Sequence, residues 1–233
     1  MTETEFKDYL NKNNIDITQE QLQLFNKYAD YLLEYNKTTN LTAIKTTKEV
    51  YLKHFYDSII LLKHIDLTNE NILDIGSGAG FPGVPLKILR PNIKLTLLDS
   101  NGKKIKFLLS LKEVLNLEYE VINDRAEEYV KETRETFDVV VSRAVASMPV
   151  LAELSLPFVK VNGKFIAYKG NINEDLEQGK NAIKILSDGK IDIIKELLPI
   201  ENSERTLVII TKNKPTDKIY PREYNKINKK PLR

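Results

Sequence analysis

The chain contains no cysteine among its 233 residues. This absence excludes disulfide bonds, thiolate metal ligands and any mechanism that begins with a cysteine nucleophile. The sequence also lacks a run of about 18 uncharged apolar residues, the length that a membrane-spanning helix needs, and its acidic first residues contain no signal-peptide core. We therefore expect a soluble cytoplasmic protein without a metal site or membrane contact, and a monomer as the default assembly.

A strong excess of one charge is also missing, because 35 basic residues face 33 acidic ones and the net charge is +2. The charge is nevertheless uneven, since residues 212–233 contain eight basic and two acidic residues. A basic segment of this kind is suited to binding phosphates, although a solvated tail is an equal alternative. With 42% hydrophobic and 29% charged residues, the rest of the chain has ordinary globular composition and predicts one main core.

The first 65 residues have the pattern of helices. Thr18 and Gln21 form a capping-box sequence that precedes apolar residues at helical spacing, and Thr46 with Glu49 marks a second helix start. We expect three segments: an N-terminal helical extension over residues 1–65, a central domain over residues 66–213, and a basic C-terminal tail over residues 214–233 that packs on or beside that domain.

Short apolar runs alternate with helical stretches from residue 71 onward. This alternation predicts an α/β fold with a parallel sheet covered by helices on both faces. The last two runs are joined by too few residues for a crossover helix, so they predict an antiparallel pair. The seven expected strands are Asn71–Ile75, Ile93–Asp99, Tyr119–Ile122, Phe137–Ser142, Lys164–Tyr168, Lys190–Leu197 and Arg205–Thr211.

A glycine-rich loop follows the first expected strand. Gly76, Gly78 and Gly80 allow a sharp turn and a close approach of a ligand to the backbone. Asp99 ends the next expected strand, where a carboxylate is able to bind ribose hydroxyls. In an open α/β sheet both features meet at the carboxyl ends of the strands, so we expect a nucleotide-like ligand there.

Charge distinguishes two candidate ligands for this loop. Gly78, Gly80 and Gly83 match the spacing of a dinucleotide fingerprint, which leaves a nicotinamide-dependent oxidoreductase as an alternative. Asp74, however, lies two residues before Gly76 and places a carboxylate at the mouth of the loop, where it opposes a pyrophosphate. A cationic ligand such as S-adenosylmethionine fits better.

The motif Asp74-Ile-Gly-Ser-Gly-Ala-Gly resembles the first motif of class I S-adenosylmethionine-dependent methyltransferases. Its continuation through Phe81-Pro-Gly is similar to one branch, the bacterial 16S ribosomal RNA guanine-N7 methyltransferases, also called the glucose-inhibited division protein B family. Further blocks of resemblance occur in order along nearly the whole chain: Asn40-Leu-Thr, His54-Phe-Tyr-Asp-Ser, Leu98-Asp-Ser, Asp124-Arg-Ala-Glu, Ser142-Arg, Lys169-Gly and Tyr220-Pro-Arg.

The resemblance implies a seven-stranded class I methyltransferase, Rossmann-like sheet and S-adenosylmethionine as the methyl donor. It also implies that the substrate is a specific guanine in 16S ribosomal RNA or the small ribosomal subunit. A ribosome-binding factor with an inactive cofactor fold is a third hypothesis, against which the intact loop argues. The cofactor contacts expected from the loop and the resemblance are Asp74, Gly76, Gly78, Phe81, Asp99, Ala126, Glu127 and Arg143.

Guanine N7 has an in-plane lone pair and carries no proton, so its methylation needs alignment and no general base. We therefore assign no residue as catalytic, and Arg143 is the best candidate for fixing the base or the cofactor. The RNA is expected to meet positive charge and groups that position a guanine. The candidates are His54, Asp57, Lys103, Lys104, Lys169, Arg222, Lys229 and Lys230.

Overall fold

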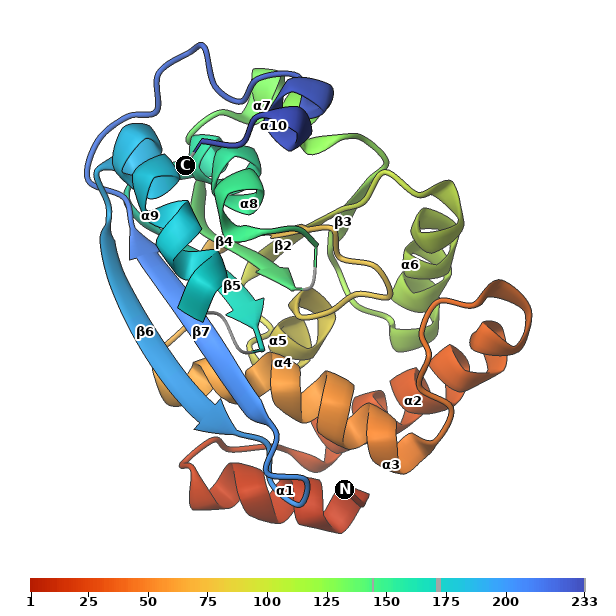
Figure 1. The fold of residues 1–233 in the computed structure, drawn as a ribbon. Helices are drawn as coiled ribbons and strands as arrows, with labels where there is room; N and C mark the ends of the chain where they lie inside the picture. Colours follow the sequence, from red (N-terminus) through yellow and green to blue (C-terminus); the bar gives the residue numbers. More distant parts are fainter. Residues whose placement is uncertain (144, 171–172, 233) are drawn as a thin grey trace.

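A seven-stranded sheet runs through the centre of the computed structural model, which describes residues 1–143, 145–170 and 173–232 (Figure 1). The strand order is β3-β2-β1-β4-β5-β7-β6. The first five strands are parallel, and β7 is antiparallel to both β5 and β6. The strands are β1 (Asn71–Ile75), β2 (Lys94–Leu98), β3 (Glu120–Ile122), β4 (Phe137–Arg143), β5 (Val159–Lys169), β6 (Lys190–Leu197) and β7 (Glu204–Thr211).

Helices precede the sheet and connect its strands. The N-terminal set consists of α1 (Glu3–Lys12), α2 (Gln19–Thr39), α3 (Thr47–Glu49), the π-helix η1 (Val50–Tyr56), α4 (Asp57–Ile59) and the 3₁₀-helix η2 (Ile60–Lys63). The others are α5 (Gly83–Leu89), α6 (Gly102–Leu115), α7 (Ala126–Thr133), α8 (Met148–Ser155), η3 (Leu156–Phe158), α9 (Asn173–Ser187) and α10 (Tyr224–Lys229). No helix among the described residues is long and apolar enough to cross a membrane.

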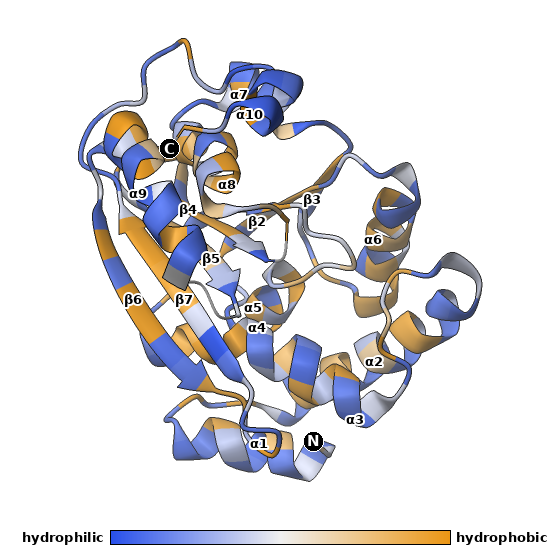
Figure 2. Ribbon diagram, in the orientation of Figure 1, coloured by the Kyte–Doolittle hydropathy of each residue, from blue (hydrophilic) through white to orange (hydrophobic). Residues whose placement is uncertain are grey.

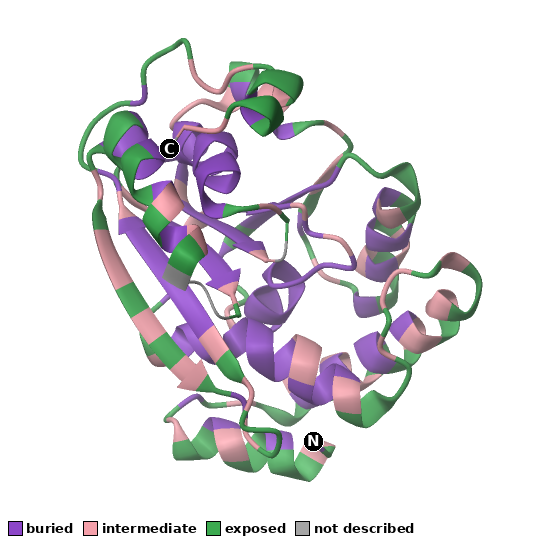
Figure 3. Cartoon of the chain, viewed as in Figure 1, coloured by how far each residue is buried: buried purple, intermediate pink, exposed green. Residues whose placement is uncertain are grey.

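Both faces of the sheet are covered, as the alternation of strands and helices predicts. Successive side chains of a strand point to opposite faces, so Val139 and Val141 join one hydrophobic cluster and Val140 joins another. The first cluster lies against the N-terminal helices, α5 and α6, and the second lies against α7 to α10. The sheet interior is accordingly apolar and buried (Figures 2 and 3).

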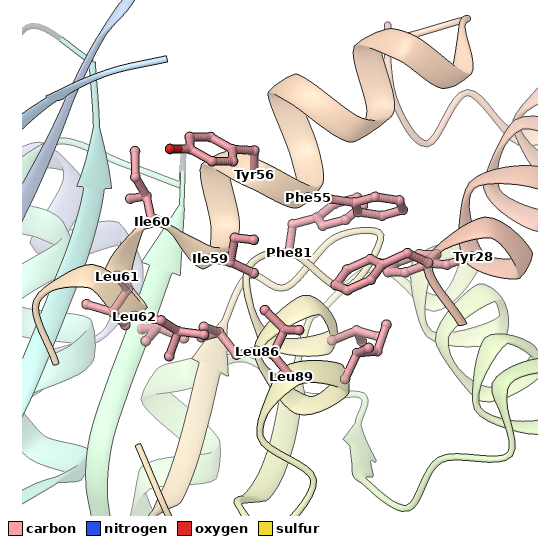
Figure 4. Packing of buried hydrophobic residues seen from close by; sticks show 14 of the residues in the cluster. Tyr28, Phe55, Tyr56, Ile59, Ile60, Leu61, Leu62, Phe81, Leu86 and Leu89 are labelled. Carbon is pink, nitrogen blue, oxygen red and sulfur yellow. The ribbon is translucent and has the colours of Figure 1, made fainter. Parts of the chain in front are cut away.

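The N-terminal helices share one continuous core with the sheet. Edge and tilted aromatic contacts join Phe6, Phe25, Tyr51 and Phe55 at centroid distances of 4.9 to 6.5 Å. Figure 4 shows Phe55 and Tyr28 packed with residues of α5 beneath them. Such pairs contribute about 0.5 to 1.5 kcal/mol each beyond the area that they bury.

The expected helix starts are present, with one helix more than the sequence analysis found. Thr18 and Gln21 make a complete capping box at the start of α2, and the Thr46 hydroxyl accepts from the amide of Glu49. The second expected helix is divided into α3, η1, α4 and η2. The additional helix is α1, whose own capping box at Thr2 and Glu5 was a signal that could have revealed it.

The last two strands form the expected antiparallel pair, and their burial explains their order. Residues 207–210 of β7 are buried, whereas β6 alternates between exposed and partly buried residues. The more apolar strand therefore lies inside the sheet and β6 forms its edge (Figure 3). After β7 the chain crosses to the far end of the sheet, where α10 lies beside α7 and α8 (Figure 1).

Candidate functional site

The loop after β1 turns sharply because three of its residues are glycines with positive φ. The angle is 69° at Gly76, 61° at Gly78 and 93° at Gly80, a region that residues with a side chain rarely adopt. The amide of Gly76 donates to the carbonyl of Leu98 at the end of β2, at 2.8 Å. The loop is therefore tied to the carboxyl ends of two neighbouring strands, where ligands bind in open α/β sheets.

Asp74 lies beneath this loop and not at its mouth, where the sequence analysis placed it. Its side chain shares a face of β1 with Ile72 and points toward α5. Oδ2 accepts from the amide of Gly83 at 2.8 Å, and Oδ1 has no hydrogen-bond partner among the described residues. Burial raises the pKa of Asp74 to about 7, although the Gly83 amide and the charge of Arg143 act to lower it.

Asp99 holds the other side of the glycine loop, as its position in the sequence predicts. Oδ2 accepts from the amide of Gly78 at 3.0 Å and lies 3.3 Å from Nζ of Lys104. Oδ1 accepts from the amide of Asn101 at 2.9 Å. The carboxylate is thus fixed at the end of β2, beside the most open part of the loop.

A cavity of about 370 Å³, here named the glycine-loop cavity, opens between the glycine loop, the end of β2 and the start of α7. Val145 faces the loop, since a side chain at Gly76 would come within 2.5 Å of its Cγ2. At the far end, Oε1 of Glu127 accepts from Nε of Arg125 at 2.6 Å. The lining residues are Ile75, Gly76, Leu98, Asp99, Ser100, Lys104, Asp124, Arg125, Ala126, Glu127, Val145, Leu154 and Tyr224.

This lining fits S-adenosylmethionine. The apolar surface of Leu98, Ala126 and Leu154 suits a purine. The carboxylates of Asp99 and Glu127 suit ribose hydroxyls and a positively charged group. Gly76 lines the cavity without a side chain, and Val145 fills the space that a side chain there would take. Five of the eight expected cofactor contacts, namely Gly76, Asp99, Ala126, Glu127 and the adjoining Gly78, therefore gather around this cavity.

The C-terminal tail contributes a wall of the glycine-loop cavity, which sequence reasoning missed. Tyr224 lines the cavity, and the guanidinium of Arg125 lies 4.7 Å from the centre of its ring. Arg222 anchors this part of the tail, since its Nε and Nη2 donate to the fully buried carboxylate of Glu153 at 2.8 and 2.6 Å. The Arg222 amide donates to the same carboxylate at 2.9 Å.

Phe81 and Arg143 lie on the opposite side of the loop from Tyr224. The Phe81 ring is buried between Tyr28 and His54, with centroids at 5.2 and 4.3 Å, and the Arg143 guanidinium lies 5.0 Å from its centre. Figure 4 shows Phe81 among the aromatic residues of the first cluster. Its side chain therefore packs against the N-terminal helices, and only its backbone remains beside the glycine loop.

Arg143 joins the end of β4 to the π-helix η1. Nη1 donates to the carbonyl of Lys53 at 3.0 Å and to Oδ2 of Asp57 at 2.9 Å. Nη2 lies 3.0 Å from Nδ1 of His54, whose Nε2 lies 2.9 Å from the hydroxyl of Thr42. Burial, followed by the charge of Arg143, lowers the pKa of His54 to about 3. The imidazole is therefore neutral and accepts from Arg143.

A second cavity, of about 300 Å³ and here named the arginine cavity, opens beside this contact. Asp57 lies between two cations, because Arg205 at the start of β7 donates from Nε to Oδ1 at 2.9 Å. The sequence offered no signal for Arg205 beyond a charge at the start of an apolar strand. The lining residues are His54, Asp57, Ile60, Arg143, Tyr168, Lys169, Gly170, Arg205, Thr206 and Leu207.

The remaining expected RNA contacts differ in their solvent exposure and in their hydrogen-bond partners. Lys103, Lys229 and Lys230 are exposed. Lys104 is partly exposed and contacts Asp99. Lys169 is largely buried and donates to the carbonyl of Ala146 at 2.5 Å and to Asp175 at 2.9 Å, so it holds the segment that follows β4. Among the described residues, no group of three or more His, Asp or Glu side chains is placed to hold a metal ion.

Comparison with known proteins identifies the family of this chain. The chain is 46% identical to the ribosomal RNA small subunit methyltransferase G of Geobacillus sp., over 100% of both chains. It is 45% identical to the protein of the same name from Bacillus subtilis, over 98% of both chains. The family model of rRNA small subunit methyltransferase G matches residues 21–202. The chain belongs to this methyltransferase G family.

Solved structures show the same fold at low sequence identity. A methyltransferase from Pyrococcus furiosus has a TM-score of 0.57 at 17% identity, over 81% of this chain and 97% of that chain. SMU.776, solved in complex with SAH, has a TM-score of 0.53 at 16% identity, over 67% of this chain and 50% of that chain. The methyltransferase G family member described here therefore has the class I methyltransferase fold that its sequence predicts.

Proposed function

We propose that this protein transfers a methyl group from S-adenosylmethionine to N7 of a specific guanine in 16S ribosomal RNA. The observation that carries the proposal is the glycine-loop cavity, where Gly76 and the carboxylates of Asp99 and Glu127 line one apolar-walled space. Membership of the methyltransferase G family supports the RNA substrate. An RNA of the small ribosomal subunit also supports the cytoplasm as the site of action.

The groups beside the two cavities favour alignment over proton transfer. S-adenosylmethionine supplies an electrophilic methyl group when bound. His54 donates no proton at neutral pH because its pKa is lowered to about 3, and Asp57 is held by two arginines. Guanine N7 requires no base, so residues that only bind and orient the two partners are sufficient. Alignment of this kind contributes several kcal/mol to catalysis.

The oxidoreductase alternative is disfavoured by the hydrogen bonds at the start of α5. A pyrophosphate needs unpaired amides at that position, whereas the Gly83 amide donates to Asp74 and the Val84 amide donates to the carbonyl of Gly80. Titration calorimetry distinguishes the methyltransferase hypothesis from the oxidoreductase hypothesis. We expect micromolar binding of S-adenosylmethionine and no binding of NAD. Tight binding of NAD with none of S-adenosylmethionine would establish the alternative.

The decisive experiment is transfer of labelled methyl from S-adenosylmethionine to small-subunit RNA from cells that lack this protein. Free RNA, assembly intermediates and complete subunits serve as separate substrates, and nuclease mapping locates the label. We expect label at N7 of one guanine. Cofactor binding without transfer to any of these substrates would contradict the proposed substrate and would fit the inactive ribosome-binding factor. Light scattering during the same preparation tests the expected monomer.

A further inference from the structure

The C-terminal tail reaches the glycine-loop cavity through Tyr224. This residue begins α10, and it lines the cavity together with residues 124–127 and Leu154. The guanidinium of Arg125 lies over its ring, so Tyr224 belongs to the wall that follows β3. In an open α/β sheet the loops after the parallel strands form the ligand site. Tyr224 adds an aromatic ring to that site from a segment outside the sheet.

Contacts on both sides of Tyr224 in the sequence hold this residue in place. Two residues earlier, the amide and the side chain of Arg222 donate to the buried carboxylate of Glu153 at 2.6 to 2.9 Å. Three residues later, the side chain of Ile227 is fully buried in the second hydrophobic cluster. A residue that is already fixed loses little conformational entropy on binding, so more of its contact energy appears as affinity.

The wall around Tyr224 combines apolar surface with a charge pair that is already satisfied. Ala126 and Leu154 are buried and line the same cavity. Glu127 accepts from Nε of Arg125 at 2.6 Å, and the Arg125 guanidinium also lies 4.7 Å from the centre of the Tyr224 ring. The ammonium and carboxylate of a methionyl group would find no unpaired partner in this charge pair. A flat, neutral heterocycle gains from both the apolar surface and the ring.

We propose that Tyr224 is a cofactor-binding residue whose ring packs against the adenine of S-adenosylmethionine, together with Ala126 and Leu154. This assignment rests on the proposed function, which gives the cavity its cofactor. The charge of the tail predicts contacts with RNA phosphates only, so the ring gives this segment a second task. The C-terminal tail is then part of the cofactor site.

Substitutions of Tyr224 test the contact by titration calorimetry on the whole protein. We expect Tyr224→Ala to bind S-adenosylmethionine about tenfold more weakly, the loss typical of one base–aromatic stack, and Tyr224→Phe to bind it like the wild type. The matched control is Leu232→Ala, because Leu232 also packs on the second cluster from the tail but does not line the cavity. Wild-type affinity in Tyr224→Ala would overturn the proposal.

Adenosine distinguishes a contact with the adenine from one with the methionyl group. Its binding is followed by saturation-transfer NMR. We expect Tyr224→Ala to weaken adenosine binding by the same factor as S-adenosylmethionine binding, because adenosine keeps the ring and lacks the methionyl group. A loss confined to S-adenosylmethionine would place Tyr224 against the methionyl group and would contradict the proposal.

Hydrogen exchange in α10 distinguishes a cofactor contact from a purely structural role. A ligand that contacts Tyr224 stabilises the conformation in which the tail closes the cavity, so it slows amide exchange there. The amides of Ile227 and Lys230 report this change, because they donate to the carbonyls of Glu223 and Lys226. We expect S-adenosylmethionine to slow their exchange in the wild type and not in Tyr224→Ala. Protection that is independent of the cofactor in the wild type would make Tyr224 structural only.

The absence of tryptophan from the chain allows an independent measurement by fluorescence. Tyr224→Trp introduces a single indole at the cavity. Ile219→Trp introduces one at a tail residue that is 67% exposed and does not line the cavity. We expect S-adenosylmethionine to quench the fluorescence of the first variant and to leave that of the second unchanged. Cofactor binding without quenching in Tyr224→Trp would count against the contact.

These results are separable from failure of the proposed function. If adenosine and S-adenosylmethionine bind in a manner that depends on Tyr224 but no ribosomal RNA is methylated, the proposed RNA substrate fails and the contact stands. If ribosomal RNA is methylated and Tyr224→Ala binds the cofactor like the wild type, the proposed function stands and the contact is overturned.

Discussion

The glycine-loop cavity and the arginine cavity share one edge of the sheet, yet they are built in different ways. The first takes most of its contacts from three short consecutive segments, residues 75–76, 98–100 and 124–127. The second brings together Asp57, Arg143 and Arg205, and the hydrogen bonds that join them span 86 and 148 residues of sequence. Backbone geometry shapes the first cavity, whereas side-chain charge shapes the second.

The difference shows which kind of site is visible in a sequence. A turn that needs positive φ requires glycine wherever it occurs, so the loop has a recognisable spacing. The charged groups Asp57, Arg143 and Arg205 of the second cavity come one each from α4, β4 and β7, so they have no spacing to recognise. The two cavities should also respond to substitutions independently.

The largest effect should come from Gly76→Val. The branched side chain would face a φ of 69° and would approach Val145 within 2.5 Å. We expect S-adenosylmethionine affinity, as measured by calorimetry, to fall at least about 100-fold, or about 3 kcal/mol. Gly102→Val is the control, because the nearest atom there is 3.8 Å away. Unchanged cofactor affinity in Gly76→Val would contradict this account of the loop.

Arg222→Ala, which removes the anchor of the C-terminal tail, should have the next largest effect. It leaves the buried carboxylate of Glu153 without its cation, and loss of one partner of a buried pair costs about 3 kcal/mol of unfolding free energy. Because Tyr224 lines the glycine-loop cavity, we also expect about tenfold weaker cofactor binding. Urea denaturation and calorimetry measure the two effects. The double variant Arg222→Met with Glu153→Met should recover stability. Full cofactor affinity with weaker RNA binding would instead make Arg222 an RNA contact.

The contributions of Asp74 and His54 to the free energy of unfolding should change with pH in opposite directions. Burial raises the pKa of Asp74 to about 7 from an ordinary value of 3.8, so the native state binds the extra proton. Its contribution to stability therefore falls as pH rises from about 4 to 7. We expect Asp74→Asn to gain about 3 kcal/mol relative to the wild type between pH 4.5 and pH 8, as measured by urea denaturation.

His54, beside the arginine cavity, should give the opposite pH dependence of stability. Its pKa is lowered to about 3 from 6.5, so the unfolded chain binds the proton in that interval and stability rises with pH. His54→Asn should therefore lose its disadvantage relative to the wild type as pH falls from about 6.5 to 4. The same sign of slope in both variants would show that one of the two side chains is not buried as described.

The smallest effect should come from the exposed lysines at the end of α10. If Lys229 and Lys230 contact RNA phosphates, their replacement by glutamine should reduce the slope of log affinity against log salt by about 0.7 to 0.9 for each lost contact. Cofactor affinity should not change. Lys7→Gln with Lys12→Gln is the matched control, because α1 lies at the opposite end of the molecule from α10 (Figure 1). An unaltered slope would leave these lysines without a role in RNA binding.

The sequence was most informative where structure depends on neighbouring residues. The bounds of β1 and β6 agree with the predicted strands, and the Thr18 capping box opens α2 as expected. The π-helix at residues 50–56 was not predicted, and neither was the hydrogen bond from Arg143, 90 residues away, to its Lys53 carbonyl. The burial of Asp74 was also missed. Its position next to the loop is evident in the sequence, but its direction depends on α5 packing over that face of β1.

The sequence by itself determined the sheet, the glycine loop and the methyltransferase family, because periodicity, turn geometry and motif spacing are local properties. Only the tertiary structure decided that Arg222 pairs with Glu153 and that Tyr224 closes the glycine-loop cavity. The same holds for the contacts of Asp57 with both Arg143 and Arg205. The physical reason is that burial and pairing depend on which distant segments pack together, and a single sequence does not show this.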